Sequence, residues 1–127
     1  MVYFVGAGSG APDLITVRGA RLLNQADQII YAGSLVNPEL LDYKKESAVV
    51  YDSAKMTLEE VVEKIQEAES TGKMTVRLHT GDPCVYGAIR EQMDVLEEKN
   101  IAFDYCPGVS SFCGAASALN LEYTLPD

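Results

Sequence analysis

The sequence has 127 residues, of which 47% are hydrophobic, a size and composition that suit one compact domain with one core. Its net charge of −9 argues against non-specific nucleic-acid binding, which requires a basic surface, so we expect no nucleic-acid partner. No apolar run approaches the roughly 18 residues of a membrane span, and the first residues lack a signal-peptide layout, so we expect a soluble, cytoplasmic protein without a membrane partner.

Short apolar or β-branched runs alternate with helical patterns along the whole chain. The runs predict strands at residues 2–5, 28–31, 48–51, 74–78 and 102–105. Helices are predicted at residues 17–25 and 58–69, from Ile89 to about residue 100, and from about residue 112 to 119. Strands and helices that alternate over short connections favour an α/β fold. We expect a single domain with a mainly parallel five-stranded sheet, flanked by helices on both faces.

The helix at residues 58–69 has the clearest pattern. Its apolar side chains recur at helical spacing and fall on one face. Thr57 and Glu60 form a capping box at its start, and Gly72 is a natural stop after its end. These local signals fix both ends of the helix within a few residues.

The cysteines and the histidine do not form a metal-binding pattern. Cys84, Cys106 and Cys113 are odd in number and have no CxxC spacing, and His79 is the only histidine. We interpret the cysteines as reduced, partly buried thiols that behave as small apolar side chains. We therefore expect no protein-bound metal.

Small residues follow four of the five predicted strands. In open parallel sheets, ligands bind beyond the carboxyl ends of the strands, so the loops at that edge are the first candidates for a site. The four loops lie at residues 6–13, 31–35, 79–87 and 107–111. Each alone is also typical of a tight strand-to-helix turn, but together they predict a site for a flat or nucleoside-like ligand.

Residues 6–11 (GAGSGA) also fit the loose dinucleotide-binding pattern G-x-G-x-x-G/A. Two details argue against that function. Residues 12–15 separate the glycines from the helix cap at Thr16, although the fingerprint glycines should open the helix directly. Residues 31–33 (YAG) stand where an acidic ribose ligand is expected. A dehydrogenase is therefore the weaker hypothesis.

Three of these loops carry a resemblance to a known family. Residues 5–10 (VGAGSG), together with residues 14–16 (LIT), resemble the opening motif of the tetrapyrrole methylases. Residues 81–87 (GDPCVYG) are similar to the second motif of the family, and residues 107–111 (PGVSS) to the third. The match covers the whole chain in the right order and spacing, which makes it more specific than any single motif.

Within this family, the chain most resembles the members that methylate carbon 11 of precorrin-4 or cobalt-precorrin-4 in cobalamin biosynthesis. The resembling segments are residues 31–37 (YAGSLVN), 78–83 (LHTGDP) and 86–93 (YGAIREQM). The resemblance implies an enzyme that transfers a methyl group from S-adenosyl-L-methionine to a tetrapyrrole. Open alternatives are another tetrapyrrole methyltransferase of the same pathway and a non-catalytic module that binds S-adenosylmethionine or a tetrapyrrole.

The resemblance also implies a domain organisation. The family members have two domains and bind the methyl donor in the cleft between them. Residues 1–127 correspond to the amino-terminal domain, so we expect that the carboxyl-terminal domain is absent from this chain. The fragment alone should be inactive, and the full-length protein is expected to form a homodimer.

Seven positions match the cofactor contacts of the family. They are Ser9, Thr80, Gly81, Asp82, Val85, Ser110 and Ser111. The residue types suit the task, because the Asp82 carboxylate can accept hydrogen bonds from a ribose or pair with a cationic group, and Gly81 lets the backbone approach a ligand. Ser110 and Ser111 stand where a helix begins, so plain N-caps remain an alternative for both.

Two positions depart from the family pattern. Ser9 stands where the family commonly has proline. Ala32 stands where members acting on uroporphyrinogen III commonly have an aspartate proposed to be catalytic, so no catalytic residue is carried over.

The substrate that the resemblance implies carries many carboxylates, which cations near the site would have to offset. Arg77 and Lys55 are the candidate cations, although an arginine on a strand is more often a solvated edge residue.

Overall fold

Five parallel strands form the sheet in a computed structural model that describes residues 1–126. The strands are β1 (Val2–Gly6), β2 (Gln28–Tyr31), β3 (Val49–Asp52), β4 (Thr75–His79) and β5 (Phe103–Cys106), and their order across the sheet is β3-β2-β4-β1-β5. The predicted strands are confirmed, with each bound within one residue of the observed one. Because all the pairings are parallel, the carboxyl ends of the strands share one edge of the sheet.

The helices connect the strands as expected. They are α1 (Val17–Gln25), α2 (Leu58–Ser70), α3 (Ile89–Glu98) and α4 (Ser111–Leu119). Thr57 caps α2, since its hydroxyl accepts a hydrogen bond from the Glu60 amide at 3.2 Å. Three short 3-10 helices, η1 (Pro12–Leu14), η2 (Pro38–Tyr43) and η3 (Ser53–Lys55), were not predicted.

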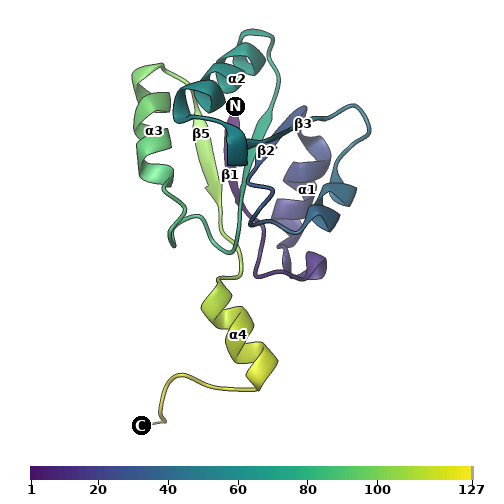
Figure 1. Cartoon of the computed structure of the whole chain (residues 1–127), viewed down its shortest axis with the longest axis vertical. Helices are drawn as coiled ribbons and strands as arrows, with labels where there is room; N and C mark the ends of the chain where they lie inside the picture. The colour runs from purple at the N-terminus through teal and green to yellow at the C-terminus, as the bar shows by residue number, and fades with distance from the viewer. Residues whose placement is uncertain (127) are drawn as a thin grey trace.

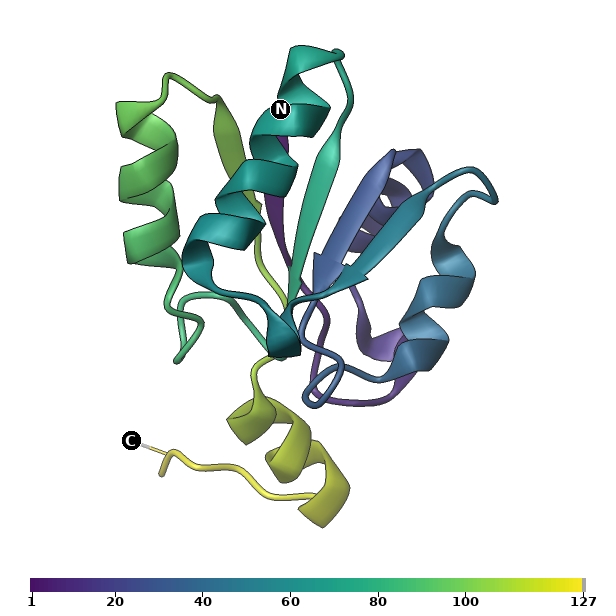
Figure 2. The ribbon, with the colours of Figure 1, turned by 45° about the horizontal axis from the view of Figure 1, so that its top comes forward.

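Helices cover both faces of the sheet, and each face has its own apolar cluster (Figure 2). On the α1 face, Leu22 and Leu23 pack against Val5, Ile29 and Val76. The opposite face packs against α2 and α3. Its buried residues include Val2, Phe4, Ile30, Val61, Ile65, Met93 and Leu96. Burial of apolar surface on both faces stabilises this layered arrangement and holds the carboxyl edge of the sheet in place.

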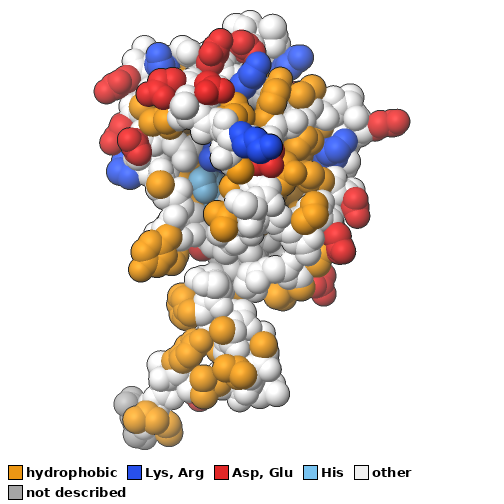
Figure 3. Space-filling view, viewed as in Figure 1, with side chains coloured by type: hydrophobic (Ala, Val, Ile, Leu, Met, Phe, Trp, Pro, Cys, Tyr) orange, Lys and Arg blue, Asp and Glu red, His pale blue; other side chains and the backbone are white. Residues whose placement is uncertain are grey.

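The fourth helix differs from the expectation that helices flank the sheet. Helix α4 projects beyond the carboxyl edge and has no buried residue (Figure 1). Apolar side chains are visible along this projecting segment (Figure 3), and Phe112 and Leu119 are 56% and 72% exposed. At its contact with the domain, Gly114 leaves room for Ser9, because a Cβ at Gly114 would lie 2.3 Å from the Ser9 Oγ.

Candidate functional site

The loops after β1, β4 and β5 meet backbone to backbone at the carboxyl edge of the sheet. The Gly81 amide donates to the Gly8 carbonyl at 2.8 Å, and the Gly8 amide donates to the Gly81 carbonyl at 3.2 Å. A Cβ on Gly6 would lie 2.6 Å from the Gly108 Cα, which is too close for any side chain. The glycines therefore allow these loops to pack backbone against backbone, whereas the sequence predicted a close approach to a ligand.

The loop after β2 joins the same edge. The Asn37 side chain donates from Nδ2 to the Gly10 carbonyl at 3.0 Å and thereby ties this loop to the loop after β1. The Gly33 amide donates to Asp52 Oδ1 at 2.9 Å, which fixes the same loop to the end of β3. All four loops expected to form the site thus lie on one edge of the sheet.

Asp82 holds the loop after β4 against the loop after β5. Its buried carboxylate accepts hydrogen bonds from the amides of Cys84 and Gly108, at 2.9 and 3.0 Å, and from the Tyr105 hydroxyl. Burial alone would raise the pKa of Asp82, but hydrogen bonds from Tyr105, Cys84 and Gly108 outweigh it and lower the pKa to about 2. The carboxylate is therefore ionised and already engaged within the chain, a positioning role that the sequence did not indicate.

Six of the seven predicted cofactor contacts line one hollow of about 160 Å³, which we name the serine hollow. Its lining residues are Thr80, Gly81, Asp82, Val85, Tyr86, Ser110 and Ser111. The seventh predicted contact, Ser9, is not among them and lies against Gly114 of α4 instead. The hollow is formed where the loop after β4 faces the start of α4.

Ser110 carries an unused hydroxyl in this hollow. The residue occupies the N-cap position of α4, but its side chain makes no capping hydrogen bond. Its Oγ is buried and has no hydrogen-bond partner within residues 1–126. A buried hydroxyl without a partner costs about 1–3 kcal/mol, so a plain N-cap does not explain Ser110. Ser111 is the exposed first residue of α4 and therefore does not occupy the N-cap position.

A second hollow, of about 350 Å³, adjoins the serine hollow, and we name it the arginine hollow. The two share Thr80, Val85 and Tyr86 in their walls. Ala32 lies in the wall of the arginine hollow, at the carboxyl end of a parallel strand, as its place in the sequence predicts. The wall also includes the side chains of Arg77 and His79.

Arg77 is not the solvated edge residue that its type favours. It lies on β4, the central strand of the sheet, and burial lowers its pKa to about 10. Its Nε donates to Gln92 Oε1 at 3.1 Å, and its Nη1 donates to the Ile30 carbonyl at 3.2 Å. The other candidate cation, Lys55, is exposed on η3 and lines neither hollow.

His79 is buried and neutral. Burial, together with the positive charge of Arg77, lowers the pKa of His79 to about 3. Its ring stacks on Phe4, with the ring centroids 6.0 Å apart, and its Nε2 has no hydrogen-bond partner within the part of the chain that the structure describes. The imidazole therefore adds a polar but uncharged group to the arginine hollow.

The lowered pKa of His79 predicts a dependence of stability on pH. The unfolded chain takes up a proton near pH 6.5 that the folded chain takes up only near pH 3, so the stability from neutral His79 is present above pH 6.5 and is lost as the pH falls. The free energy of unfolding should fall by up to about 1.4 kcal/mol per pH unit because of His79. Urea unfolding of the protein and of His79→Gln across this range measures it. If the free energy of unfolding changes with pH equally steeply in both proteins, the prediction is contradicted.

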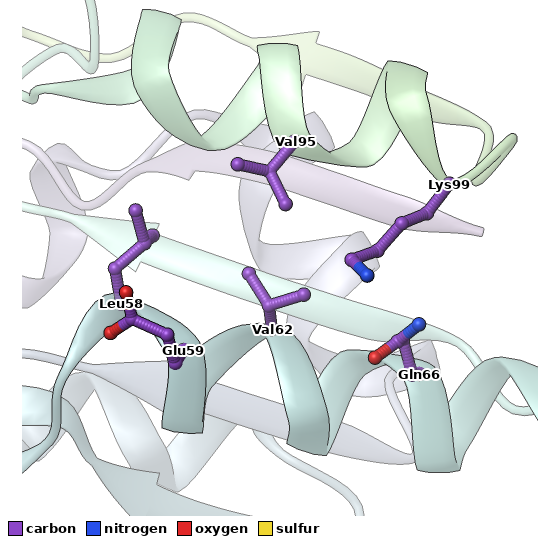
Figure 4. A pocket seen from close by; sticks show the side chains of 6 residues that line it. All are labelled: Leu58, Glu59, Val62, Gln66, Val95 and Lys99. Atoms are coloured by element: carbon purple, nitrogen blue, oxygen red, sulfur yellow. The ribbon is translucent and has the colours of Figure 1, made fainter.

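A third depression lies between α2 and α3 and has a volume of about 180 Å³. Figure 4 shows that Leu58 and Val62 from α2 face Val95 from α3, with Glu59 and Lys99 also at its walls. None of the carboxyl-edge loops contributes to this depression. Its aliphatic walls are typical of a surface groove between packed helices, and we assign it no chemistry.

Within the described part of the chain, the cysteines and acidic residues give no sign of a metal site. No group of three or more His, Cys, Asp or Glu side chains in residues 1–126 is placed to hold a metal ion. Cys106 is buried, whereas Cys84 and Cys113 are exposed, so the interpretation as partly buried thiols is wrong for those two. Over the same residues, no helix has the length and apolarity that crossing a lipid bilayer requires.

Comparison with known proteins gives consistent matches over the whole chain. The signature of the tetrapyrrole (corrin/porphyrin) methylases matches residues 1–127. The cobalt-precorrin-4 C(11)-methyltransferase of Methanocaldococcus jannaschii is 52% identical over 126 residues, which are 99% of this chain and 49% of that relative. This chain therefore spans about half the length of the curated relatives that it matches.

Solved structures also resemble the chain. The X-ray structure of a cobalt precorrin-4 methyltransferase, a cobalamin biosynthetic enzyme, superposes with a TM-score of 0.96 at 48% identity. That match covers 99% of this chain and 53% of the other. A uroporphyrin-III C-methyl transferase from Thermus thermophilus, crystallised with S-adenosyl homocysteine, superposes with a TM-score of 0.75 at 30% identity, covering 91% of this chain and 47% of the other.

Proposed function

Because the chain belongs to the tetrapyrrole (corrin/porphyrin) methylase family, we propose that it is the amino-terminal half of an S-adenosylmethionine-dependent C-methyltransferase. The substrate would be precorrin-4 or cobalt-precorrin-4, methylated at carbon 11. The identity of 52% to a cobalt-precorrin-4 C(11)-methyltransferase and the TM-score of 0.96 to a cobalt precorrin-4 methyltransferase support this assignment. A carboxyl-terminal half would complete the enzyme, since the relatives are about twice as long.

The buried Ser110 hydroxyl is the observation that carries the proposed cofactor site. It has no hydrogen-bond partner within residues 1–126, and Thr80 and Gly81 line the same serine hollow. A nucleoside offers hydroxyl and amino groups that satisfy such a side chain, and closely approaching backbone suits a ligand of this kind. Ser9, Val85 and Ser111 would complete the contacts from this half, and Asp82 would position the loop.

The proposed methyl transfer mainly requires that the protein align the methyl donor with the carbon that is methylated. The methyl donor, when bound, supplies a methyl group on a positively charged sulfur, and the electron-rich macrocycle supplies the carbon nucleophile. Ala32 has no group that moves a proton, so this position would supply no acid or base, and the residues of this chain would mainly hold the two reactants in line.

Methyl transfer by the full-length protein tests this function. The protein is incubated with S-adenosylmethionine and either precorrin-4 or cobalt-precorrin-4, and mass spectrometry and NMR of the product are recorded. We expect one added methyl group at carbon 11, and the preferred substrate shows whether cobalt is inserted first. Methylation at another carbon would indicate a different methyltransferase of the pathway. Binding of both ligands without transfer would indicate a non-catalytic module.

Replacement of Gly81 with valine should weaken cofactor binding. Gly81 has a φ of +59°, and a Cβ there would lie 3.6 Å from the Ser111 amide nitrogen, facing the start of α4 across the serine hollow. We expect the dissociation constant of S-adenosylhomocysteine for the full-length protein to rise at least about tenfold, or about 1.4 kcal/mol. Isothermal titration calorimetry measures it.

Gly72→Val is the matched control. Gly72 has a φ of +70°, so both valines impose backbone strain of about 1–3 kcal/mol, but nothing lies within 4 Å of a Cβ at Gly72. The control should therefore lose stability and keep its affinity for S-adenosylhomocysteine. If the two variants bind this ligand equally well, Gly81 does not border the cofactor site.

A further inference from the structure

We propose that the arginine hollow binds one carboxylate group of the tetrapyrrole substrate through the guanidinium of Arg77. This inference rests on the proposed function, and it adds a substrate-binding residue that the family motifs did not supply. Arg77 is a partly buried cation, and a charge withdrawn from water requires a compensating partner.

Arg77 has no acidic partner in the part of the chain that the structure describes. The sequence contains 19 Asp and Glu residues against 10 Lys and Arg, yet none of the acidic groups forms an ion pair with Arg77. Its hydrogen bonds go to two uncharged groups, the Gln92 side chain and the Ile30 carbonyl. A guanidinium has five N–H donors, so most of its hydrogen-bonding capacity remains available for a ligand.

The neighbours of Arg77 keep it in place without neutralising it. Gln92 is buried on α3 and accepts from Nε, while the Ile30 carbonyl on β2 accepts from Nη1. Nη2 makes no hydrogen bond within residues 1–126, and Arg77 contributes to the wall of the arginine hollow. The guanidinium is therefore held in a fixed orientation at the hollow, as in sites that bind a carboxylate through two parallel hydrogen bonds.

The arginine hollow suits a carboxylate-bearing arm of a large flat ligand. It holds about 350 Å³, compared with about 160 Å³ for the serine hollow, and Ala32 and Leu35 add apolar wall. Partial burial strengthens the attraction between Arg77 and an anion, because the local dielectric is lower than that of water. His79 adds a neutral imidazole whose Nε2 lacks a partner.

The position of the hollow favours the substrate over the methyl donor as the source of the carboxylate. The serine hollow contains six of the seven predicted cofactor contacts, and the arginine hollow lies next to it across Thr80, Val85 and Tyr86. A tetrapyrrole anchored at Arg77 would therefore lie beside the methyl donor. S-adenosylmethionine also has a carboxylate, so the test measures the two ligands separately.

The test compares Arg77→Met with Arg77→Lys in the full-length protein. Arg90→Met is the matched control, because Arg90 is an exposed arginine on α3 that pairs with Asp94 and Glu97. We expect Arg77→Met to raise the KM for the tetrapyrrole about 10- to 150-fold, the range for a lost charged hydrogen bond, and to change kcat little. Arg77→Lys should restore part of the loss, and Arg90→Met should behave like the parent.

Two binding titrations complete the test. The dissociation constant of S-adenosylhomocysteine should stay within about twofold in Arg77→Met, since the methyl donor does not use this residue. Uroporphyrin III, a tetrapyrrole rich in carboxylates, serves as a probe whose fluorescence reports binding without turnover. The parent should bind uroporphyrin III most tightly, Arg77→Lys more weakly, and Arg77→Met most weakly.

The outcomes separate this inference from the proposed function. A parent protein that binds uroporphyrin III but transfers no methyl group would refute the function, and the Arg77 variants would still decide the inference. Unchanged tetrapyrrole affinity in folded Arg77→Met overturns it, as does a loss confined to S-adenosylhomocysteine. If Arg77→Met fails to fold, the uncharged Arg77→Gln decides the question: a tetrapyrrole KM equal to that of the parent would overturn the inference.

Discussion

Replacing Gly108 with alanine is expected to destabilise the protein by about 3 kcal/mol or more and to abolish binding of S-adenosylhomocysteine. A Cβ at Gly108 would lie 2.4 Å from the Gly81 carbonyl oxygen and 2.8 Å from the Gly6 Cα. Both are backbone atoms of loops that meet at the carboxyl edge, so neither moves aside as a flexible side chain would. The loops would have to separate, and the hydrogen bond from the Gly108 amide to Asp82 would be lost.

Gly72→Ala provides the control for this variant. A Cβ at Gly72 meets nothing within 4 Å, so its cost is limited to the strain of a φ of +70°, about 1 kcal/mol. Urea unfolding compares the two variants, and calorimetry compares their affinities for S-adenosylhomocysteine. Equal stability of Gly108→Ala and Gly72→Ala would show that the close approach of the three loops is unimportant.

Residues 1–127 alone are expected to fold, to bind S-adenosylhomocysteine at least about a hundredfold more weakly than the full-length protein, and to transfer no methyl group. The serine hollow is bordered by the start of α4, a helix without a buried residue, and under the proposed function residues 1–127 would supply only one wall of the cleft. Loss of about 3 kcal/mol of contacts from the other wall corresponds to roughly a hundredfold in affinity.

Calorimetric titration of the two proteins measures this difference, and circular dichroism establishes that the fragment is folded. The exposed Phe112 and Leu119 on α4 also favour self-association of the fragment, which gel filtration over a concentration series detects. Equal dissociation constants would mean that the site is complete within these residues, and the two-domain cleft would have to be abandoned.

The sequence predicted the strands, the long helices and the edge of the sheet at which the four loops meet. Those features depend on local signals, such as the Thr57 cap of α2 and the short apolar runs of the strands. The η2 helix was missed, because a 3-10 helix of six residues is too short to show a helical period. Its signals were the N-cap Asn37 and Pro38 at the first helical position.

The sequence did not predict the contacts between segments that lie far apart along the chain. The burial of Arg77 follows from the central place of β4 in the sheet, and local sequence patterns do not predict the order of the strands. The Tyr105 hydroxyl reaches Asp82 from another strand, so the engaged carboxylate also depends on tertiary structure. The placement of Ser9 against Gly114 depends in the same way on where α4 projects.

Hydrogen–deuterium exchange of the full-length protein, with and without S-adenosylhomocysteine, tests the proposed cofactor site most directly. The ligand should slow exchange in residues 79–88 and 107–111, whose loops form the serine hollow. Exchange in residues 66–73, at the far end of α2, should be unchanged and serves as the internal reference. Protection that leaves both loops unaffected would contradict the placement of the methyl donor at the carboxyl edge of the sheet.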